Sequence, residues 1–155
     1  RGTREDSEKF YKELGDRFDV KDPTYLEDNN KLCFVGCDIG CQVRNGKRWY
    51  SMDQSVAMEA FLEDVGVAPT SRIASPMPNN TLLTSRPEPL NKVESKIFRS
   101  QMGSLNYFSH TLRYDIGYAT SRLSQFQSNP TVGARLALDR VLKYLRCTSD
   151  YPLLF

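Results

Sequence analysis

The stretch LCFVGCDIGCQVRNGKRWYSM, residues 32–52, decides the fold of the first part of the chain. Apolar and polar side chains alternate over residues 32–43, which is the pattern of a half-buried β-strand. Asn45 and Gly46 follow, and this pair favours a two-residue hairpin turn because both central positions of a type I′ turn need positive φ. Residues 47–52 then supply the return strand. The stretch predicts an antiparallel β-hairpin.

The two faces of the long strand differ in character. Alternation places the odd-numbered residues from Cys33 to Val43 on an apolar face and the even-numbered residues, beginning with Phe34, on the other. Gly36 and Gly40 lie on this second face and indicate a bulge or the close approach of another backbone. We therefore expect one buried face and one polar face that is rich in glycine.

Cysteine usage indicates a reduced environment. Cys33, Cys37 and Cys41 fall on the apolar face of the strand, where free cysteine behaves as a small hydrophobic residue, and Cys147 lies far from them. His110 is the only histidine, and the cysteine spacing lacks the second ligand pair typical of a zinc site. We expect free cysteines, no metal, no cofactor and an intracellular protein.

Five further stretches have the periodicity of amphipathic helices: residues 5–18, 53–66, 93–112, 115–127 and about 130–147. The expected inward residues are Phe10, Leu14 and Phe18 in the first; Val56, Ala60, Phe61 and Val65 in the second; Ile97, Phe98, Met102, Leu105 and either Phe108 or Leu112 in the third; Ile116, Ala119, Leu123 and Phe126 in the fourth; and Val132, Leu136, Val141 and Leu145 in the last. The expected helix ends are an N-cap at Asp6 or Ser7, a stop at Gly66, and an N-cap at Asn129 followed by Pro130.

The segment 67–92 separates two parts of the sequence. It holds five prolines and is longer than most connections inside a compact domain, so we expect a linker. The chain of 155 residues then divides into residues 1–66, the linker 67–92 and a lobe formed by residues 93–155. The predicted class is α+β: an N-terminal helix and an antiparallel hairpin, followed by a lobe of three to four helices. No run of about 18 apolar residues predicts insertion into a membrane.

Charge is distributed unevenly, although the net charge is only +2. Residues 1–68 hold 10 Lys and Arg against 14 Asp and Glu, whereas residues 69–155 hold 11 against 5. A polyanionic partner would therefore meet the second half. The alternative interpretation of this charge distribution is an ordinary solvated surface without a polyanionic partner.

The sequence shows no catalytic constellation. Asp38 is the only acidic residue of its strand, and no glycine-rich phosphate-binding loop occurs. A histidine-dependent triad would need His110, but a lone histidine in an amphipathic helix is more often a surface or packing residue. We expect this chain by itself not to be an enzyme and to have no catalytic residues.

Residues suited to nucleic acid are more numerous. Aromatic side chains beside basic ones can stack on bases while the cations meet phosphates, and Trp49 and Tyr50 point to opposite faces of the return strand. The alternatives are that Trp49 is a core residue of a small sheet and that the basic residues only solvate helix surfaces. The candidate nucleic-acid-binding residues are Lys47, Arg48, Trp49 and Tyr50 in the hairpin and Arg99, Arg113, Arg122, Lys143 and Arg146 in the helical lobe.

Several segments resemble copia-type retrotransposon Pol polyproteins. The family patterns are Y-R-S-x-x-G-S-L-x-Y, R-P-D-I-x-Y-A, S-R-L-S-Q-F-x-S-N-P-T and R-V-L-R-Y-L-K, and the similar segments here are SKIFRSQMGSLNY (95–107), RYDIGYA (113–119), SRLSQFQSNPT (121–131) and RVLKYLR (140–146). In the first half, FDVKD (18–22) is similar to F-x-M-K-D, and FVGCDI (34–39) is similar to F-L-G-I-E-I. The sequence departs from the patterns at Phe98, Tyr114 and Cys147, where the family usually has Tyr, Pro and Gly.

The resemblance implies the C-terminal part of a reverse transcriptase. It implies that the hairpin is the end of the palm near the primer terminus, that residues 53–66 begin the thumb, and that the later helices continue towards ribonuclease H. The polymerase aspartates would lie before Arg1 and the acidic residues of ribonuclease H after Phe155. We therefore expect a processed product or a piece of something longer, without either active site.

Two functions remain as hypotheses. In the first, the chain is a non-catalytic fragment of a reverse transcriptase that grips an RNA–DNA or DNA duplex, with the remainder of a Pol polyprotein as its protein partner. In the second, it is a retroelement-derived structural subunit, recruited into a host protein complex through its helical lobe. An isolated two-stranded hairpin is only marginally stable, so a partner sheet or helix is expected in either case.

Overall fold

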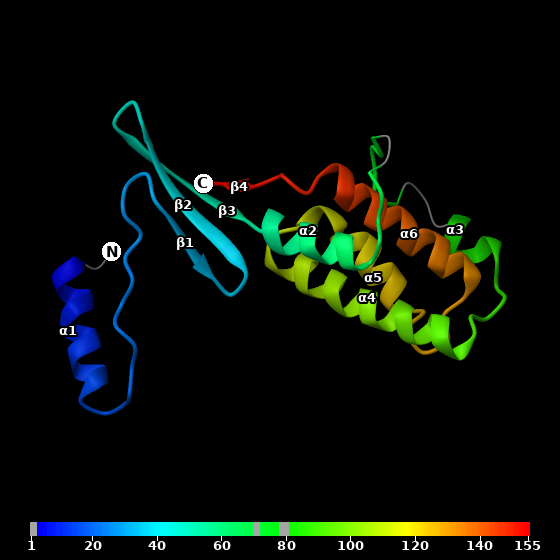
Figure 1. Cartoon of the computed structure of the whole chain (residues 1–155), viewed down its shortest axis with the longest axis horizontal. Coiled ribbons are helices and arrows are strands. Elements are labelled where there is room, and N and C mark those ends of the chain that lie inside the picture. Colours follow the sequence, from blue (N-terminus) through cyan, green and yellow to red (C-terminus); the bar gives the residue numbers. More distant parts are fainter. Residues whose placement is uncertain (1–2, 70–71, 78–80) are drawn as a thin grey trace.

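A computed structural model describes residues 3–69, 72–77 and 81–155. A sheet with α1 beside it occupies one end of the molecule, and a group of packed helices occupies the other (Figure 1). The predicted α+β class is confirmed. The elements in chain order are α1 (Arg4–Gly15), β1 (Lys31–Phe34), β2 (Cys37–Arg44), β3 (Lys47–Asp53), α2 (Ser55–Asp64), α3 (Thr81–Ser85), α4 (Lys92–Thr111), η1 (Tyr114–Ile116), α5 (Gly117–Ser124), α6 (Val132–Cys147) and β4 (Leu153–Leu154).

The predicted strand 32–43 is wrong, because the chain reverses in the middle of it. Val35 and Gly36 have φ values of 50° and 73°, which form a two-residue turn between β1 and β2. Phe34 is paired with Cys37 across this turn. Gly36 permits the reversal since it adopts positive φ without steric cost. The sheet is therefore an antiparallel meander with the strand order β1-β2-β3-β4.

The turn also changes which residues share a face. Residues paired across an antiparallel ladder lie on the same side, so Phe34 joins Cys37 on the apolar face and Cys33 joins Asp38 on the other. The prediction that Cys33 is buried is consequently wrong, whereas Cys37 and Cys41 are buried. Burial raises the pKa of the Cys37 thiol. Cys33, Cys37, Cys41 and Cys147, all among the described residues, form no disulfide in this structure.

Two glycines of the sheet contact side chains closely. The hydroxyl of Tyr107 in α4 donates to the carbonyl of Val35 over 2.6 Å. A Cβ at Gly36 would lie 2.8 Å from the hydroxyl oxygen of Tyr107. A Cβ at Gly40 would lie 2.7 Å from Oγ of Ser51. The close approach predicted at Gly36 and Gly40 exists, but side chains make it rather than another backbone.

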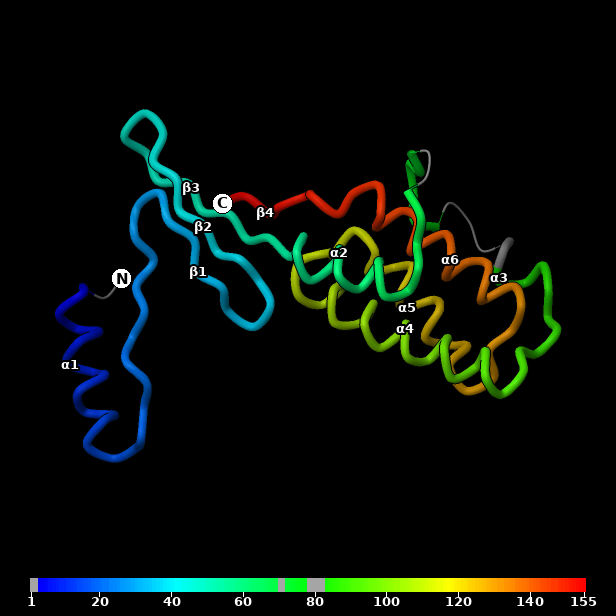
Figure 2. Tube along the Cα trace, viewed as in Figure 1, coloured from blue at the N-terminus to red at the C-terminus, as the bar shows by residue number. Residues whose placement is uncertain are grey.

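The second hairpin turn and the return strand are confirmed. Asn45 and Gly46 have φ values of 51° and 73°, and β3 begins directly after them. The C-terminal segment then returns to the sheet, where β4 pairs with β3 (Figure 2). Tyr50 and Phe155 exchange two backbone hydrogen bonds of 2.9 and 3.3 Å. The end of the chain therefore ties the sheet to the helical part.

The hydrophobic core lies among the helices. Met58 and Leu62 of α2 pack into one cluster with residues of α4, η1, α5 and α6. Met77 and Leu83 join them, so the segment predicted as a linker contributes to this core and contains α3. The division into 1–66, 67–92 and 93–155 stays a prediction. The largest fully buried side chains of the cluster are Phe98, Met58, Leu62, Met102, Leu105, Ile116, Leu123, Leu138, Leu142, Leu145 and Val141.

In α2, α4 and α6, four residues that the sequence predicts to face the core are exposed instead. Val56, predicted to face inward, is 70% exposed, because α2 turns Met58 and Leu62 to the core instead. Ala60 is exposed on the same helix. Ile97 of α4 and Leu136 of α6, also predicted to face inward, are 45% and 43% exposed.

Local chemistry defines the helix ends. At the end of α2, Gly66 has a φ of 76° and donates to Glu63, while Val67 donates to Leu62, which is a Schellman motif and confirms the predicted stop. The N-cap of α6 is Thr131, whose hydroxyl accepts from the backbone N–H of Ala134. The predicted cap at Asn129 was two residues too early.

The N-terminal helix α1 buries none of its residues. Thr3 is its N-cap, forming a capping box with Asp6, and the helix ends at Gly15 rather than at residue 18. Phe10 and Phe18, predicted to face inward, are 59% and 63% exposed because no described part of this chain covers them. None of the described helices has the length and apolar character needed to cross a bilayer.

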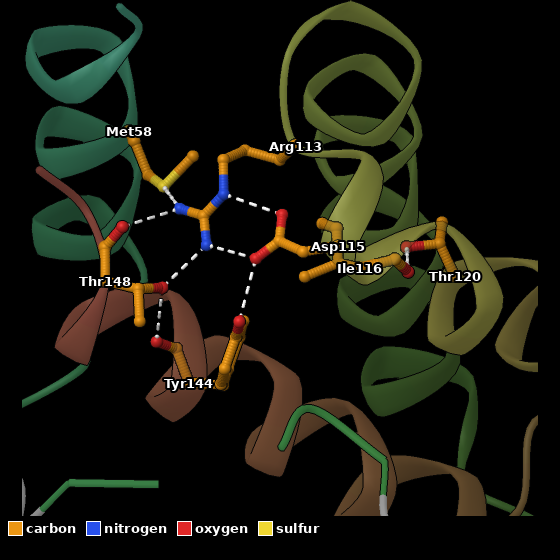
Figure 3. A network of polar contacts seen from close by, with 7 residues as sticks. All are labelled: Met58, Arg113, Asp115, Ile116, Thr120, Tyr144 and Thr148. Carbon is orange, nitrogen blue, oxygen red and sulfur yellow. Dashed lines mark hydrogen bonds and ion pairs between the residues drawn. The ribbon is translucent and has the colours of Figure 1, made fainter. Parts of the chain in front are cut away.

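One buried guanidinium joins three helices of the core (Figure 3). Arg113 is 4% exposed and forms a two-pronged ion pair with Asp115, with N–O distances of 2.8 and 2.9 Å. It also donates to the backbone carbonyl and the hydroxyl of Thr148 at the end of α6, and to the sulfur of Met58 on α2. Tyr144 donates over 2.8 Å to Oδ2 of Asp115, the same oxygen that accepts from Nη2 of Arg113.

Removal of this guanidinium should destabilise the protein strongly. We expect Arg113→Met to lower the free energy of unfolding by about 2 kcal/mol, because the carbonyl and hydroxyl of buried Thr148 lose their donor. The lost ion pair adds little to this, since the Asp115 side chain is 37% exposed. Urea denaturation measures the change. The control Lys96→Met, at an exposed position of α4, should change the stability by less than about 0.5 kcal/mol. Equal effects of the two substitutions would contradict the assigned role.

The same network predicts a pH dependence. Burial acts to raise the pKa of Asp115, but hydrogen bonds and charge from Arg113 and the hydroxyl of Tyr144 outweigh it, so the net pKa lies below the ordinary 3.8. A carboxyl whose pKa is lowered by folding stabilises the native state above its unfolded pKa, and this contribution is lost as the pH falls through the folded pKa. The wild type should therefore lose stability below about pH 4 more steeply than Asp115→Asn. Urea midpoints across this range test it, and parallel curves would refute it.

The strained turn of β1 and β2 predicts a stabilising substitution. Val35 is a β-branched residue at positive φ, a conformation that costs such residues about 1–2 kcal/mol and that asparagine tolerates better. We expect Val35→Asn to raise the free energy of unfolding by about 1 kcal/mol, measured by urea denaturation. The matched control is Asn45→Val in the second turn, which should lower it by a similar amount.

Candidate nucleic-acid interface

An open groove crosses the polar face of the sheet. Its volume is about 320 Å³. The side chains come from β1, β2 and β3, with the C-terminal segment at one border. The groove is lined by Lys31, Asp38, Gln42, Arg44, Trp49, Tyr50, Ser51, Asp53, Pro152 and Leu154.

The strand register orders these residues along the groove. Arg44 is paired with Lys47 beside the second turn, and Gln42 is paired with Trp49 in the next row. Gly40 with Ser51 and Asp38 with Asp53 form the two rows after that. Arg44 and Lys47 therefore lie at one end, with the indole next to them, and two carboxylates lie at the other end. Lys31 of β1 is paired with Gly40 and adds a cation in the row beside the carboxylates.

The four predicted residues of the hairpin are divided between the two faces of β3. Trp49 lines the groove and is 48% exposed, so the alternative of a core tryptophan does not hold. Lys47 lies on the same face by register. Arg48 and Tyr50 have the opposite parity, although part of Tyr50 still borders the groove.

Arg48 pairs with an acidic residue of the N-terminal segment. Its guanidinium donates to both oxygens of Asp28 over 2.7 and 3.0 Å, and this hydrogen bond lowers the pKa of Asp28. The thiol of buried Cys41 lies 3.7 Å from the same carboxylate. The ion pair of Arg48 with Asp28 therefore holds the segment before β1 against the apolar face of the sheet.

The five predicted residues of the helical lobe are spread over several elements. Arg99 of α4 donates to the backbone carbonyls of Gln127 and Ser128, and Arg122 of α5 donates to Gln125. Arg113 is buried, and its guanidinium donates to groups of the protein interior. The predicted contact of Arg113 with a phosphate is therefore wrong, because the guanidinium is not accessible.

The remaining two residues lie on α6. Lys143 is exposed and borders a second cavity together with Arg135 and Asp139, which form an ion pair of 2.9 Å. Arg146 is half-buried in the last turn. These cations are not part of the groove on the sheet.

Sequence reasoning did not select four charged residues of the groove: Lys31, Asp38, Arg44 and Asp53. The predicted alternation places Asp38 on the correct face, whereas Lys31 reaches this face only because the chain turns at Val35 and pairs Lys31 with Gly40. Arg44 was within reach, since it directly precedes the Asn45 turn and must therefore face Lys47 across the hairpin.

The described residues include no group of three or more His, Cys, Asp and Glu side chains that could hold a metal ion. His110 is exposed in the last turn of α4, and its Nδ1 lies 2.7 Å from the carbonyl of Asn106. This agrees with the interpretation of His110 as a surface residue.

Two curated proteins of Arabidopsis thaliana are similar to nearly the whole chain. They are retrovirus-related Pol polyproteins from transposons RE2 and RE1, 38% and 31% identical over 146 and 141 residues, which is 89% of this chain in both cases. An uncharacterized mitochondrial protein of the same plant is 29% identical over 71% of the chain.

These relatives are much longer than the chain. It spans 9% of the length of each polyprotein and 45% of the length of the mitochondrial protein. No family model matches the chain, and no solved structure matches it significantly. The resemblance carried by the sequence motifs is confirmed, because these homologues are retrovirus-related Pol polyproteins from transposons.

Proposed function

We propose that this chain is a non-catalytic fragment of a retrotransposon reverse transcriptase and that it grips primer–template nucleic acid through the groove on its sheet. The observation that carries the proposal is the exposed Trp49 in an open groove beside Arg44, Lys47 and Lys31. An exposed indole offers a stacking surface to a base, and the cations offer partners to phosphates. Homology to Pol polyproteins supports nucleic acid as the polyanion.

The groove favours nucleic acid over an acidic protein partner for a physical reason. Lysine and arginine side chains beside an accessible aromatic ring serve both parts of a nucleotide, the phosphate and the planar base. This arrangement is on the sheet, whereas the charge count of the sequence favoured the second half. Cross-strand register, not net charge, concentrates the cations beside the ring.

A structural subunit is the second candidate function. Val93 and Ile97 are exposed one turn apart on α4, and Leu136 is exposed on α6, so the helical lobe presents apolar side chains to solvent. Such side chains suit a protein partner. Copurification of a stoichiometric partner that survives nuclease treatment and is lost in Ile97→Asp would favour this candidate.

The nucleic-acid function predicts binding that depends on salt. We expect the chain to bind an RNA–DNA hybrid with log K falling linearly in log salt, because each phosphate contact releases condensed counterions. Lys47→Ala should reduce the slope by about 1, which corresponds to one lost phosphate contact. Fluorescence anisotropy of a labelled hybrid at several salt concentrations measures both quantities.

The matched control is Lys96→Ala, which removes the same charge from an exposed position of α4 outside the groove. It should leave the slope unchanged. Undetectable binding at low salt, or equal slope changes for both variants, would overturn the proposed site.

A further inference from the structure

Two rows of like charge lie at the two ends of the ladder between β2 and β3. Arg44 is paired with Lys47 at one end, and Asp38 is paired with Asp53 at the other. Like charges directly opposite each other on paired strands destabilise a sheet. Among the described residues, these four side chains form no ion pair with one another, with Lys31 one row away on β1, or with any other group. Both rows therefore remain open to opposite charge from a partner.

The order of these rows makes the face complementary to a second copy of itself. Residues 38 and 44 lie six positions apart on β2, which is about 20 Å in an extended chain. When a second copy faces this one with its strands reversed, the basic row of each copy lies opposite the acidic row of the other. Arg44 then meets Asp38 of the second copy, and Lys47 meets Asp53 of the second copy. A two-fold axis relates the copies, so each of these contacts occurs twice.

The rows between the charges are complementary as well. Trp49 lies one row from the basic end and is 48% exposed, whereas Ser51, the smallest side chain that lines the groove, lies one row from the acidic end. The same axis therefore places Trp49 of each copy opposite Ser51 of the other. Leu154 is paired with Ser51, lines the groove and is 64% exposed, so it supplies an apolar neighbour for the indole. An apolar centre surrounded by charged groups is the usual anatomy of a protein–protein interface.

The shape of the molecule suits this arrangement. The sheet occupies one end and the helices the other (Figure 1), and β3 leads directly into α2. Reversal of the strands therefore places the helical parts of the two copies at opposite ends of the pair. Sheets packed face to face lie about 10 Å apart, and the side chains of their inner faces fill the space between them.

We propose that the polar face of the sheet is the interface of an isologous dimer, in which two copies of this chain pack with their strands antiparallel. The inference goes beyond the proposed function and rests on the order of the charges and on the exposed indole. The facing area is roughly 300 Å² per copy, from three strands about 4.8 Å apart and about 20 Å of strand length. A standard interface buries about 800 Å² per partner, so the dimer is weak, with a dissociation constant of about 100 µM.

Self-association of the chain tests the inference. Sedimentation equilibrium from about 10 µM to about 1 mM, at low salt, brackets the expected dissociation constant. We expect a monomer–dimer equilibrium that weakens at high salt, because salt screens the ion pairs between the copies. The emission of Trp49, the only tryptophan of the chain, should shift to the blue over the same concentrations, since the indole leaves water.

A charge swap assigns the association to these rows. Arg44→Asp places like charges opposite each other in a pair of identical copies, and so does Asp38→Arg, so each variant alone should associate at least about tenfold more weakly than the wild type. An equimolar mixture of the two variants restores opposite charges at both contacts. It should associate within about twofold of the wild type, as a dimer that contains one copy of each variant.

The matched controls are Lys96→Glu on α4 and Asp64→Arg on α2, which make the same changes of charge at exposed positions outside the groove. Both should associate as the wild type does. A wild type that stays monomeric at about 1 mM would overturn the inference and leave the groove to nucleic acid or another partner. A dimer with unchanged Trp49 emission, a dimer that persists in Arg44→Asp, or a mixture of the two swap variants that does not associate would overturn it as well.

The second copy and the proposed nucleic acid use the same groove, so the two compete if both proposals are correct. A short RNA–DNA hybrid in excess should then dissociate the dimer. A hybrid that binds to the intact dimer refutes the groove as the nucleic-acid site and leaves the dimer in place. A monomeric chain that binds the hybrid with the expected salt dependence refutes only the dimer.

Discussion

The buried guanidinium of Arg113 is the interaction on which the helical half depends. It lies between α2, the turn after α4 and the end of α6, and its donors reach Asp115, Thr148 and Met58. A guanidinium in a dry site must have its donors satisfied, so these three elements can only take up positions that supply acceptors. The network thereby fixes α2 against α6, and α2 follows directly on the sheet.

The sheet, by contrast, has little core of its own. Of its apolar side chains, only Cys37 and Cys41 are buried among the described residues. Its position relative to the helices depends on β3 leading into α2, on the pairing of β4 with β3, and on the hydrogen bond from Tyr107 to Val35. This division leaves the polar face of the sheet open, and the groove forms there.

The motifs shared with Pol polyproteins have a structural meaning in this fold. Arg113, Asp115 and Tyr144 stand in the segments 113–119 and 140–146, and all three belong to the buried network. In this structure these three motif residues contribute to helix packing, and none of them lines the groove on the sheet. The proposed nucleic-acid groove uses other residues, which are adjacent only across strands.

Apart from α3, which lies in the segment predicted as a linker, the α-helices could be located from the sequence alone. Apolar periodicity located α4 and α6 to within two residues at their ends, and the glycine at 66 marked the stop of α2, because these features depend on neighbours within a few residues. The hairpin at Asn45 was determined in the same way. Free cysteines in the apolar face of β2 also followed from local pattern.

Only the tertiary structure decided the rest. Val35 takes a positive φ that its side chain disfavours, and the contact of Tyr107 from 72 residues away holds it there, so no local pattern could show the first turn. That turn exchanged the faces of β1 and brought Lys31 into the groove. The inward role of Arg113 likewise depends on acceptors from α2 and α6. Burial and strand register depend on interactions between segments that are distant in the sequence. Local sequence patterns report only the interactions between near neighbours.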